Sequence, residues 1–460
     1  MNTQSYSNEL TSLRNYFESG ATRSYAFRQQ QLLTLRLAIQ QHEQAINDAL
    51  FADLHKSPEE AYVSETGLVY AEITVALKNL QKWMKPKRVA TDLANLPSQS
   101  KIYRDALGVV LVIAPWNYPL QLCLIPLVGA IAGGNCVAIK PSEYAPATAG
   151  ILQTIIDSIY PKHYVLVAQG DGAEVVPNMV QNFRFDHIFY TGSIPVGKAV
   201  YKMAAEQLVP VTLELGGKSP AIVEADANVA VAAKRIVMGK FLNAGQTCIA
   251  PDYLLVHDSV KEALIAEMLA CLDGFYGKDK QASYELGKII NEKRFDTLVK
   301  YLQQGRIIAG GEHNKATLFI APTMLDNILP DATVMQEEIF GPILPVLTFN
   351  SRNEAMQIVR QHANPLAFYL FTASKAVEKE WIESTPFGGG CINNADVHFT
   401  NHHLPFGGVG FSGMGAYHGK FTFDTFTRLK PVMKTPVWFN PALKYPPFKG
   451  KLGLFKWFIK

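Results

Sequence analysis

A cysteine in a short turn is the first residue of this chain whose position suggests chemistry. Cys248 ends the run Asn243-Ala244-Gly245-Gln246-Thr247-Cys248, which follows a segment of helical periodicity. A cysteine nucleophile needs thiolate character and exposure, and loops and helix N-termini can provide both. An isolated cysteine is more often a buried structural thiol, and Cys123 and Cys136, which lie in apolar runs, fit that description. Composition does not choose among the five cysteines, at positions 123, 136, 248, 271 and 391.

Two acidic segments could supply a general base. Glu214 lies between apolar neighbours in the predicted strand 211–215, and the Gly216-Gly217 pair after it lets the backbone turn sharply or approach a ligand. A carboxylate at a strand end beside a glycine turn could act as a general base. A strand residue that alternates toward solvent has the same signature. The segment Glu337-Glu338-Ile339-Phe340-Gly341-Pro342 allows the same two interpretations.

A rigid loop carries an asparagine. The segment 114–119 follows a predicted strand and packs two prolines and two aromatic residues around Asn117. A side-chain amide on a rigid loop suits a hydrogen-bond donor of an oxyanion hole. A stiff turn without a chemical role is the alternative.

Two further segments could bind a nucleotide. In residues 189–197 a strand leads through a glycine turn into a helix, with Ser193 as its cap and Pro195 in its first turn. Helix N-termini after glycine turns bind phosphates. The spacing GSxxxG is not the usual GxGxxG, however, and an ordinary capped helix without a ligand would have the same sequence pattern. Lys140 and Glu143 follow another strand, where doubly wound sheets bind ligands and an acid can hold a ribose diol.

Short apolar runs alternate with segments of helix length through most of the chain. Such alternation favours parallel βαβ units with helices on both faces of a sheet. The predicted strands form a first set at 109–113, 136–139, 164–167 and 187–190, and a second at 211–215, 221–223, 253–256 and 346–349. A length of 460 residues is enough for two or three domains. We therefore predict an α/β protein with two doubly wound domains and a boundary near residue 211.

Other segments precede these two sets. Residues 1–84 predict helices, one of which begins at a capping box, Ser57-Pro58-Glu59-Glu60, and runs to about Met84. Residues 85–104 are polar and irregular, and they predict a hairpin or an arm.

Composition and motifs exclude several classes of protein. The basic excess is only 43 − 40 = 3, too small to indicate a nucleic-acid partner. No CxxC pair is present, and His398, His402 and His403 lack a second ligand cluster, so we expect no metal site. The N-terminus has no apolar signal region, and prolines and glycines interrupt the uncharged stretch 106–139, which therefore does not predict a spanning helix. A cytoplasmic protein is the simplest expectation.

The C-terminal tail has a character of its own. After Asp424 it contains eight Lys or Arg and no acidic residue, and it ends KLGLFKWFIK. Leu452, Phe455, Phe458 and Ile459 fall on one helical face. A short basic amphipathic helix can lie in a membrane interface and attract anionic lipid. Packing of the tail on the protein itself is the alternative.

Taken together and in this order, the segments resemble the aldehyde dehydrogenase superfamily. The motifs are PWNYPL at 115–120, IKPSE at 139–143, TGS with its later glycine at 191–197, LELGGKSP at 213–220, GQTC at 245–248, EEIFGP at 337–342 and PFGGVGFSGMGAYHGK at 405–420. The short N-terminus and the segments 423–430 and 445–447 are similar to the class 3 branch, which includes fatty and aromatic aldehyde dehydrogenases. Phe426-Thr427-Arg428 departs from that branch because it lacks a histidine.

The resemblance implies NAD(P)-dependent oxidation of an aldehyde, either aromatic or aliphatic with a medium or long chain, to the carboxylic acid. Cys248 would attack the aldehyde carbon and carry a thiohemiacetal, then a thioester. The Asn117 amide and the backbone N–H of Cys248 would hold the oxyanion. Glu214 would activate the water that hydrolyses the thioester.

The resemblance also implies the cofactor site. Lys140 and Glu143 would hold the adenosine ribose, Ser193 and its helix N-terminus would face the pyrophosphate, and Glu338 would bind the nicotinamide ribose with Phe340 near the nicotinamide. Gly216 would let the backbone come close to the cofactor. The remaining cofactor-binding residues would be Trp116, Gly192 and Gly197. The Glu143 carboxylate would repel a 2′-phosphate, so we expect NAD to be preferred and NADP tolerated.

The family architecture implies four regions. These are an NAD(P)-binding domain at 1–84 and 105–210, a catalytic domain at 211–395, a small β oligomerisation element at 85–104 and 396–430, most simply in a homodimer, and the basic tail at 431–460. Three alternatives stay open: transfer of the thioester to coenzyme A, a cofactor-independent thiol esterase, and a non-catalytic structural relative. Glu214 favours water as the acceptor.

Overall fold

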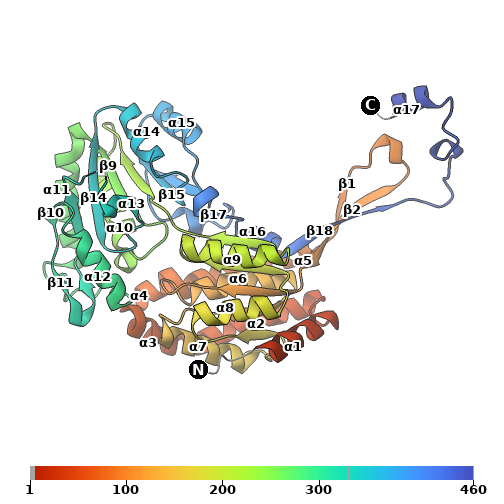
Figure 1. Cartoon of the computed structure of the whole chain (residues 1–460), viewed down its shortest axis with the longest axis horizontal. Helices are drawn as coiled ribbons and strands as arrows, with labels where there is room; N and C mark the ends of the chain where they lie inside the picture. Colours follow the sequence, from red (N-terminus) through yellow and green to blue (C-terminus); the bar gives the residue numbers. More distant parts are fainter. Residues whose placement is uncertain (1–5, 330, 459–460) are drawn as a thin grey trace.

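Two sheets covered by helices form the body of the molecule, and a three-stranded arm projects from it (Figure 1). The structure is a computed structural model and describes residues 6–329 and 331–458. In the described chain no helix is both long and apolar enough to cross a membrane.

The first sheet has six strands in the order β17-β7-β6-β3-β4-β5. Five of them are parallel and β17 is antiparallel to β7. Their bounds are β3 Val109–Ile113, β4 Cys136–Lys140, β5 Val165–Val167, β6 His187–Thr191, β7 Val211–Glu214 and β17 Gly413–Met414. The chain order reverses between β3 and β6, so the ends of these two strands border the crevice in which doubly wound sheets bind ligands.

The boundary predicted near residue 211 is wrong with respect to the sheets. β7 pairs with β6, Glu214 lying opposite Thr191, and therefore completes the first sheet instead of opening the second. The change of sheet falls between Glu214 and Pro220. Residues 413–414, predicted to belong to the oligomerisation element, also join the first sheet. Apolar runs predict strands but not their partners, because pairing is decided by tertiary contacts.

Helices enclose this sheet. Those before it are α1 Ser7–Glu18, α2 Tyr25–Gln41, α3 Glu43–Leu54, α4 Pro58–Ala61 and α5 Gly67–Met84, and those between its strands are α6 Gln121–Gly133, α7 Pro146–Ile159, α8 Gly172–Asn182 and α9 Ile194–Glu206. Every residue of α6 is buried, which explains the uncharged stretch 106–139 as strand, loop, helix and strand.

The predicted helix from Ser57 to Met84 contains a π-helical turn. Residues Tyr62–Thr66 form this turn between α4 and α5. The Ser57 side chain caps α4 by accepting the Glu60 N–H at 3.2 Å. The Glu60 carboxylate does not close the predicted capping box, because it instead accepts the backbone N–H of Asn243 at 2.8 Å.

The second sheet has seven strands in the order β10-β13-β14-β9-β8-β15-β16. All pairs are parallel except β10 with β13. Its strands are β8 Pro220–Val223, β9 Tyr253–His257, β10 Arg306–Ala309, β13 Thr323–Asp326, β14 Ile343–Phe349, β15 Ala367–Phe371 and β16 Gly389–Ile392. Its helices are α10 Val229–Phe241, α11 Lys261–Tyr276, α12 Glu292–Tyr301, α13 Thr333–Gln336, α14 Arg352–Arg360 and α15 Lys375–Ser384. A short ribbon of β11 His313–Asn314 and β12 Phe319–Ile320 lies beside it.

One apolar core joins the two sheets. It runs from the first sheet and its helices to the face of the second sheet that α10 and α11 cover, while a second core fills the other face under α12, α14 and α15. The junction between the sheets is therefore close-packed, and it holds groups from both sheets in fixed positions.

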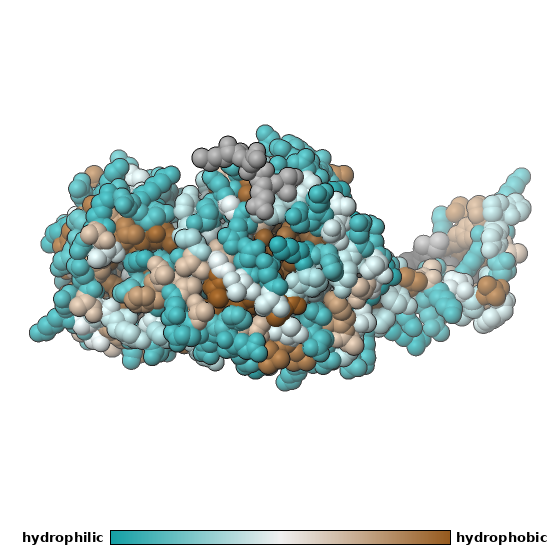
Figure 2. Space-filling view, turned by 90° about the horizontal axis from the view of Figure 1, so that it is seen from below, coloured by the Kyte–Doolittle hydropathy of each residue, from teal (hydrophilic) through white to brown (hydrophobic). Residues whose placement is uncertain are grey.

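The arm consists of three antiparallel strands, β1 Lys87–Val89, β2 Gln99–Ala106 and β18 Thr427–Lys434, with the short helix α17 Leu452–Phe458 beyond it. The prediction of a hairpin or arm at 85–104 is confirmed for β1 and β2. β18 follows the short helix α16 Lys420–Thr425 and carries exposed Leu429, Val432 and Met433. Figure 2 shows hydrophilic side chains over most of one face of the body, with separate apolar patches there and on the arm.

Candidate active site

A cavity of about 200 Å³ lies where the two sheets meet, and both Cys248 and Glu214 line it. Glu214 is the last residue of β7, at the carboxyl end of the first sheet. Cys248 follows α10 and the turn after it, just before β9 of the second sheet. The two sheets thus bring a thiol and a carboxyl group, 34 positions apart in the chain, to one cavity.

The turn before Cys248 has an unusual backbone. Asn243, Ala244 and Gly245 have φ values of 52°, 51° and 71°, in the left-handed region. A Cβ at Gly245 would lie 2.3 Å from the Gly341 carbonyl oxygen, so only glycine fits there. Left-handed backbone at a non-glycine residue costs free energy, about 1–3 kcal/mol, and persists only where surrounding contacts hold it.

Glu214 is a carboxyl group without a partner. It is 2 % exposed, and neither of its oxygens has a hydrogen-bond partner in the described part of the chain. Burial raises its pKa well above the usual range. A carboxylate with a raised pKa is a stronger base, and a buried acid that faces a cavity is a group typical of general acid–base catalysis.

Cys248 is protonated in its own surroundings. Burial raises the pKa of the thiol well above its usual range, and the carboxyl groups of Glu338 and Glu214 nearby add to the effect. The thiol must therefore lose its proton to a base before or during attack on a carbon.

Asn117 lies in the loop between β3 and α6 and is 2 % exposed. Its Nδ2 donates to the Gln246 carbonyl oxygen at 3.0 Å, two residues before Cys248. The structure thus brings this amide to the cysteine turn. The Asn117 carbonyl oxygen in turn accepts Nδ2 of Asn243 at 2.8 Å.

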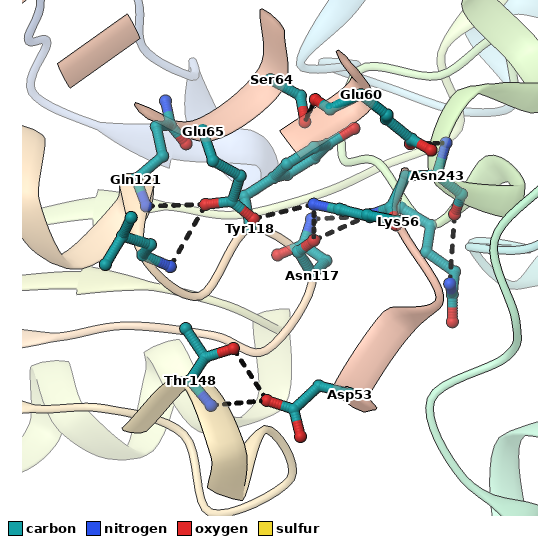
Figure 3. A network of polar contacts seen from close by, with 12 residues as sticks. Asp53, Lys56, Glu60, Ser64, Glu65, Asn117, Tyr118, Gln121, Thr148 and Asn243 are labelled. Carbon is teal, nitrogen blue, oxygen red and sulfur yellow. Dashed lines mark hydrogen bonds and ion pairs between the residues drawn. The ribbon is translucent and has the colours of Figure 1, made fainter. Parts of the chain in front are cut away.

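A buried ion pair, not anticipated from the sequence, supports this loop (Figure 3). Lys56 and Glu65, both with fully buried side chains, lie 2.8 Å apart. Lys56 Nζ also donates to the Asn117 carbonyl oxygen at 3.1 Å and lies 4.1 Å from the centre of the Tyr118 ring. Glu65 lies in the π-helical turn and accepts the N–H of Gln121 at 2.8 Å, at the start of α6.

The loop that carries Asn117 and the turn before Cys248 belong to one hydrogen-bonded network. The Tyr118 hydroxyl lies 2.5 Å from Thr247 Oγ1, and the Glu60 carboxylate accepts the Asn243 N–H. No pattern in the sequence indicates a role for Lys56 and Glu65, and the spacing of Glu60 predicts only a helix cap. Charged residues in a helical segment are most often exposed, so nothing in their spacing distinguishes a buried network from a solvated face.

Lys140 and Glu143 meet at the carboxyl end of β4. Lys140 Nζ lies 3.0 Å from Glu143 Oε2 and donates to the Pro141 carbonyl oxygen at 2.6 Å. Glu143 is partly exposed and its Oε1 accepts the Gly172 N–H at 3.2 Å, at the start of α8. A lysine and an acid are thus available at an edge where a ribose could bind.

The turn after β6 leads into α9 as predicted. Ser193 occupies the N-cap position and Pro195 the first turn, but the Ser193 side chain makes no capping hydrogen bond, contrary to expectation. Gly192 has a φ of 158°, and a Cβ at Gly197 would lie 2.6 Å from a Leu215 methyl carbon. The N-terminus of α9 and the Ser193 hydroxyl keep donors that a phosphate could take.

Glu338 lies against the glycine turn that follows β7. A Cβ at Gly216 would stand 2.1 Å from a Glu338 carboxylate oxygen, so glycine permits this approach. Burial raises the pKa of Glu338 to about 8, and its Oε1 is a buried atom without a partner. Phe340, with a left-handed φ of 46°, makes an edge contact with Trp116 at 5.3 Å between ring centres.

These groups fit a dinucleotide. Oxygens without a partner at Glu338 and Thr191 suit the hydroxyls of a ribose, an aromatic pair borders the same region, and glycines leave space where a Cβ would lie. Lys140 and Ser193 stand at the carboxyl ends of β4 and β6, where such ligands bind in doubly wound sheets, and Glu338 approaches the turn after β7 from the segment before β14.

The histidines near the C-terminus raise the question of a metal. Potential ligand atoms of Glu72, His402 and His418 lie within 4.8 Å of one another, whereas His398 and His403 are outside this group. Both Glu72 oxygens already accept the Gly419 N–H, at 2.9 and 3.0 Å. This cluster ties the segment before α16 to α5, and the absence of a metal stays a prediction.

The first sheet is of the type that binds dinucleotides, and its strand β7 ends in a carboxyl group without a partner that shares a cavity with a cysteine. This combination defines a class of protein: dehydrogenases in which a thiol carries the substrate. The sequence profile of the aldehyde dehydrogenase family matches residues 7–432, so the chain belongs to this family. It is an enzyme that oxidises aldehydes to carboxylic acids with a nicotinamide dinucleotide.

Relatives within the family resemble the whole chain. The 4,4′-diaponeurosporen-aldehyde dehydrogenase of Staphylococcus aureus is 45 % identical over 447 residues, 97 % of each chain. Human aldehyde dehydrogenase family 3 member B1 is 44 % identical and covers 95 % of this chain and 94 % of its own length. The solved substrate-bound state of Staphylococcus aureus AldH superposes with a TM-score of 0.97, at 44 % identity, over 98 % of this chain and 99 % of that one. The resemblance to the class 3 branch and the two doubly wound sheets are thereby confirmed.

Proposed function

We propose that Cys248 is the nucleophile and Glu214 the base of this reaction. The observation that carries the proposal is the shared cavity, in which the Glu214 carboxyl group has no other partner. The sulfur forms a bond to the aldehyde carbon as the thiol proton passes to a base, and the carbonyl oxygen becomes an oxyanion. The Asn117 amide and the Cys248 backbone N–H donate to that oxyanion.

Loss of a hydride from the thiohemiacetal carbon leaves a thioester, and the nicotinamide, when bound, supplies the hydride acceptor. Glu214 then takes a proton from water, the water oxygen bonds to the acyl carbon, and the carbon–sulfur bond breaks to release the acid and restore the thiol. Burial raises the pKa of Glu214, which makes its carboxylate a stronger base and supports this role. Coenzyme A as the acceptor is the alternative, and Glu214 favours water.

Nine residues are proposed to hold the cofactor. Lys140 and Glu143 would bind the adenosine ribose, and Gly192, Ser193 and Gly197 would bind the pyrophosphate. Glu338 would bind the nicotinamide ribose. Trp116 and Phe340 would lie beside the nicotinamide, and Gly216 would leave space for it. The Glu143 carboxyl group is partly exposed, so a 2′-hydroxyl can reach it beside its contacts with Lys140 and Gly172, which supports NAD as the preferred cofactor with NADP tolerated.

An apolar aldehyde, aromatic or with a medium or long chain, is the proposed substrate. Most of the side chains that line the cavity are apolar, among them Leu68, Leu122, Ile249 and Phe399. The name of the Staphylococcus aureus relative gives 4,4′-diaponeurosporen-aldehyde as its substrate. Apolar surface withdrawn from water contributes about 25 cal/mol per Å², so such a lining favours apolar bodies.

We further propose the regions implied by the family: a nucleotide domain on the six-stranded sheet, a catalytic domain on the seven-stranded sheet, and the arm as an oligomerisation element in a homodimer. The arm supports this because β18 exposes Leu429 at 55 % and Met433 at 51 %. The five cysteines are free, in keeping with a reducing, cytoplasmic location.

The tail is proposed to make weak peripheral contact with membranes and so reach lipid-derived aldehydes. α17 exposes Leu454 and Trp457, with Lys456 between them. Ile459 and Lys460, which belong to the same predicted amphipathic face and charge set, lie outside the described residues.

The test is formation of NADH with acetaldehyde, hexanal, hexadecanal, benzaldehyde and coniferaldehyde, with and without coenzyme A. We expect turnover without coenzyme A and its loss in Cys248→Ala. Cys271→Ala is the matched control, because that thiol lies on α11 outside the cavity. Aldehyde oxidation that survives Cys248→Ala, or ester hydrolysis unaffected by NAD with no aldehyde oxidation, would reject the proposal.

A further inference from the structure

A second carboxyl group lines the substrate cavity, and the proposed reaction does not use it. Asp396 lies in the loop after β16, on the side of the second sheet, and lines the same cavity as Cys248 and Glu214. It is 8 % exposed, and its Oδ1 is buried without a hydrogen-bond partner in the described chain. A buried oxygen without a hydrogen-bond partner destabilises the free protein, and a ligand that bonds it would recover that free energy.

The loop that carries Asp396 is held rigidly. Asn393 and Asp396 have left-handed φ values of 56° and 59°, a conformation that short polar side chains tolerate better than most. Asn393 forms two bonds to the residue after β15: its Oδ1 accepts the Thr372 N–H at 3.0 Å and its Nδ2 donates to the Thr372 carbonyl oxygen at 2.8 Å. Arg235 of α10 donates to the Asn393 carbonyl oxygen.

Close packing against α10 fixes the carboxyl group further. A Cβ at Gly239 of that helix would stand 3.1 Å from the Asp396 Cβ, so the loop lies directly on the helix surface. The backbone of Asp396 is therefore held against α10, and the carboxyl group lines the cavity in the free protein.

Several other polar side chains of the cavity have partners inside the chain. They are Tyr118 with Thr247 at 2.5 Å, Ser64 with the Glu60 carbonyl oxygen at 2.6 Å, and Thr400 with the Val397 carbonyl oxygen at 2.9 Å. Apart from Asp396, the lining groups with a buried oxygen and no partner are Glu214 and Thr191. These two face each other across the β6–β7 pair, on the side of the first sheet. Asp396 is the corresponding group on the opposite side.

The protonation state of the Asp396 carboxyl group determines which chemical group of a ligand it can bind. Burial raises the pKa of Asp396 well above its usual range and favours the neutral acid. A neutral carboxyl group donates through its O–H and accepts through its C=O, and a hydroxyl group has the same two capacities. An ammonium group would need the ionised carboxylate, which burial disfavours.

We propose that Asp396 is a specificity-determining residue that selects aldehydes with one hydroxyl group on an otherwise apolar body. The proposal rests on the proposed function of the cavity as the aldehyde site. The apolar lining takes the body, and Asp396 exchanges hydrogen bonds with the hydroxyl. A substrate of the same shape without the hydroxyl leaves the carboxyl group unpaired.

The experiment compares isosteric pairs: 4-(hydroxymethyl)benzaldehyde with 4-ethylbenzaldehyde, and 10-hydroxydecanal with undecanal. In the wild-type enzyme we expect kcat/KM to be about tenfold or more higher for the hydroxylated member of at least one pair. Asp396→Ala should bring this ratio to one or below, mainly by raising kcat/KM for the apolar member. Asp396→Asn, which keeps a donor and an acceptor, should retain part of the preference.

Val397→Ala is the matched control, because Val397 lines the same cavity from the same loop without a polar group. It should change both members of a pair alike and leave the ratio unchanged. Thermal unfolding of each variant shows that the fold is retained. A wild-type ratio of one or less in both pairs, or a preference that survives Asp396→Ala, overturns the proposal.

The proposed function and this inference fail in different ways. If no aldehyde is oxidised, the function fails, and the inference is then tested by calorimetric binding of 4-(hydroxymethyl)benzoate and 4-ethylbenzoate to the wild-type and Asp396→Ala proteins. Tighter binding of the hydroxylated acid that disappears in Asp396→Ala supports the role of Asp396. Equal binding of the two acids by the wild-type protein rejects it.

Discussion

At the scale of residues, the chemistry depends on groups that burial has deprived of water. Glu214, Glu338 and Asp396 each have at least one buried oxygen without a partner, although most buried polar atoms in proteins are bonded. Around the cavity these exceptions gather where ligands are proposed to bind. Cys248 is affected in the same way, because its surroundings disfavour the thiolate and make a neighbouring base necessary.

Glu214→Gln should stop thioester hydrolysis while leaving the first hydride transfer largely intact. We expect a burst of NADH of about one equivalent per active site, followed by steady turnover reduced by about 10²–10⁴-fold. Rapid mixing with a good substrate separates the two phases. Glu224→Gln is the control, because that buried carboxyl group bonds Trp381 at 2.9 Å and does not line the cavity. Full steady turnover in Glu214→Gln would mean that another group activates the water.

The raised pKa of Glu214 also predicts a pH dependence. The carboxyl group must be ionised to take a proton, so hydrolysis should slow as pH falls through a pKa well above the ordinary value for glutamate. The measurement is the steady rate against pH under conditions in which hydrolysis limits turnover. The residual rate of Glu214→Gln should lose this limb, and an unchanged limb in that variant would assign the titration elsewhere.

The proposed preference for NAD depends on the partly exposed carboxyl group of Glu143. Glu143→Gln removes the charge that would repel a 2′-phosphate, so the ratio of kcat/KM for NAD to that for NADP should fall, by about tenfold for a loss of 1.4 kcal/mol of discrimination. Initial rates with each cofactor measure the ratio. Glu174→Gln, on the first turn of α8, is the control. A wild-type ratio at or below one would contradict NAD preference itself.

At the scale of elements, loops from the two sheets are built as one unit. The loop after β3 and the turn before Cys248 exchange hydrogen bonds, and the Lys56–Glu65 pair braces them from the π-helical turn. π-helical turns occur frequently at functional sites. Here the turn aims Glu65 at the start of α6.

Breaking this brace should cost both stability and turnover. Lys56→Met leaves Glu65 buried without its partner, a change worth about 3–5 kcal/mol, and frees the Asn117 carbonyl from one of its donors. We expect a lower Tm and a kcat reduced more than KM is raised. The double variant Lys56→Met/Glu65→Gln should recover part of the stability, because the unpaired charge is gone.

Lys261→Met is the control for that experiment. Lys261 pairs with Asp326 at 3.0 Å in the second sheet, outside the cavity, and Arg306 stays beside Asp326 at 2.9 Å. Its Tm should fall less and its kcat should not change. An equal loss of kcat in both single variants would mean that the effect is general destabilisation.

At the scale of the whole molecule, the arm is the part that the body does not cover. An edge strand with exposed apolar side chains is prone to pair with another chain. We expect sedimentation equilibrium to show a dimer for the wild-type chain. Leu429→Glu/Met433→Glu places two charges on one face of β18, so this variant should sediment as a monomer. Leu208→Glu is the control, because that side chain is 84 % exposed just after α9 and belongs to none of the strands of the arm. A wild-type monomer would contradict the proposal.

The tail makes a separate prediction. The full chain should sediment with anionic vesicles at low salt and less at high salt, since surface charge is screened. Deletion of residues 449–460 should abolish this binding without loss of aldehyde oxidation. Lys451→Glu/Lys456→Glu tests charge alone. Equal sedimentation of the full and shortened chains would show that the tail does not bind lipid.

By itself the sequence determined the elements, the family and the identities of the reactive groups. Apolar runs and glycine turns predicted the strands around Cys248, Glu214 and Asn117, because local periodicity and turn chemistry are written in neighbouring residues. Seven ordered motifs then carried the resemblance.

The tertiary structure decided what depends on contacts between distant residues. β7 belongs to the first sheet, and the Glu60 carboxylate bonds the Asn243 N–H instead of capping its own helix. Lys56 is buried with Glu65, and Asp396 Oδ1 has no partner in the cavity. None of these follows from spacing, since the environment of a charged side chain, and hence its protonation and its role, is set by whatever the fold packs around it.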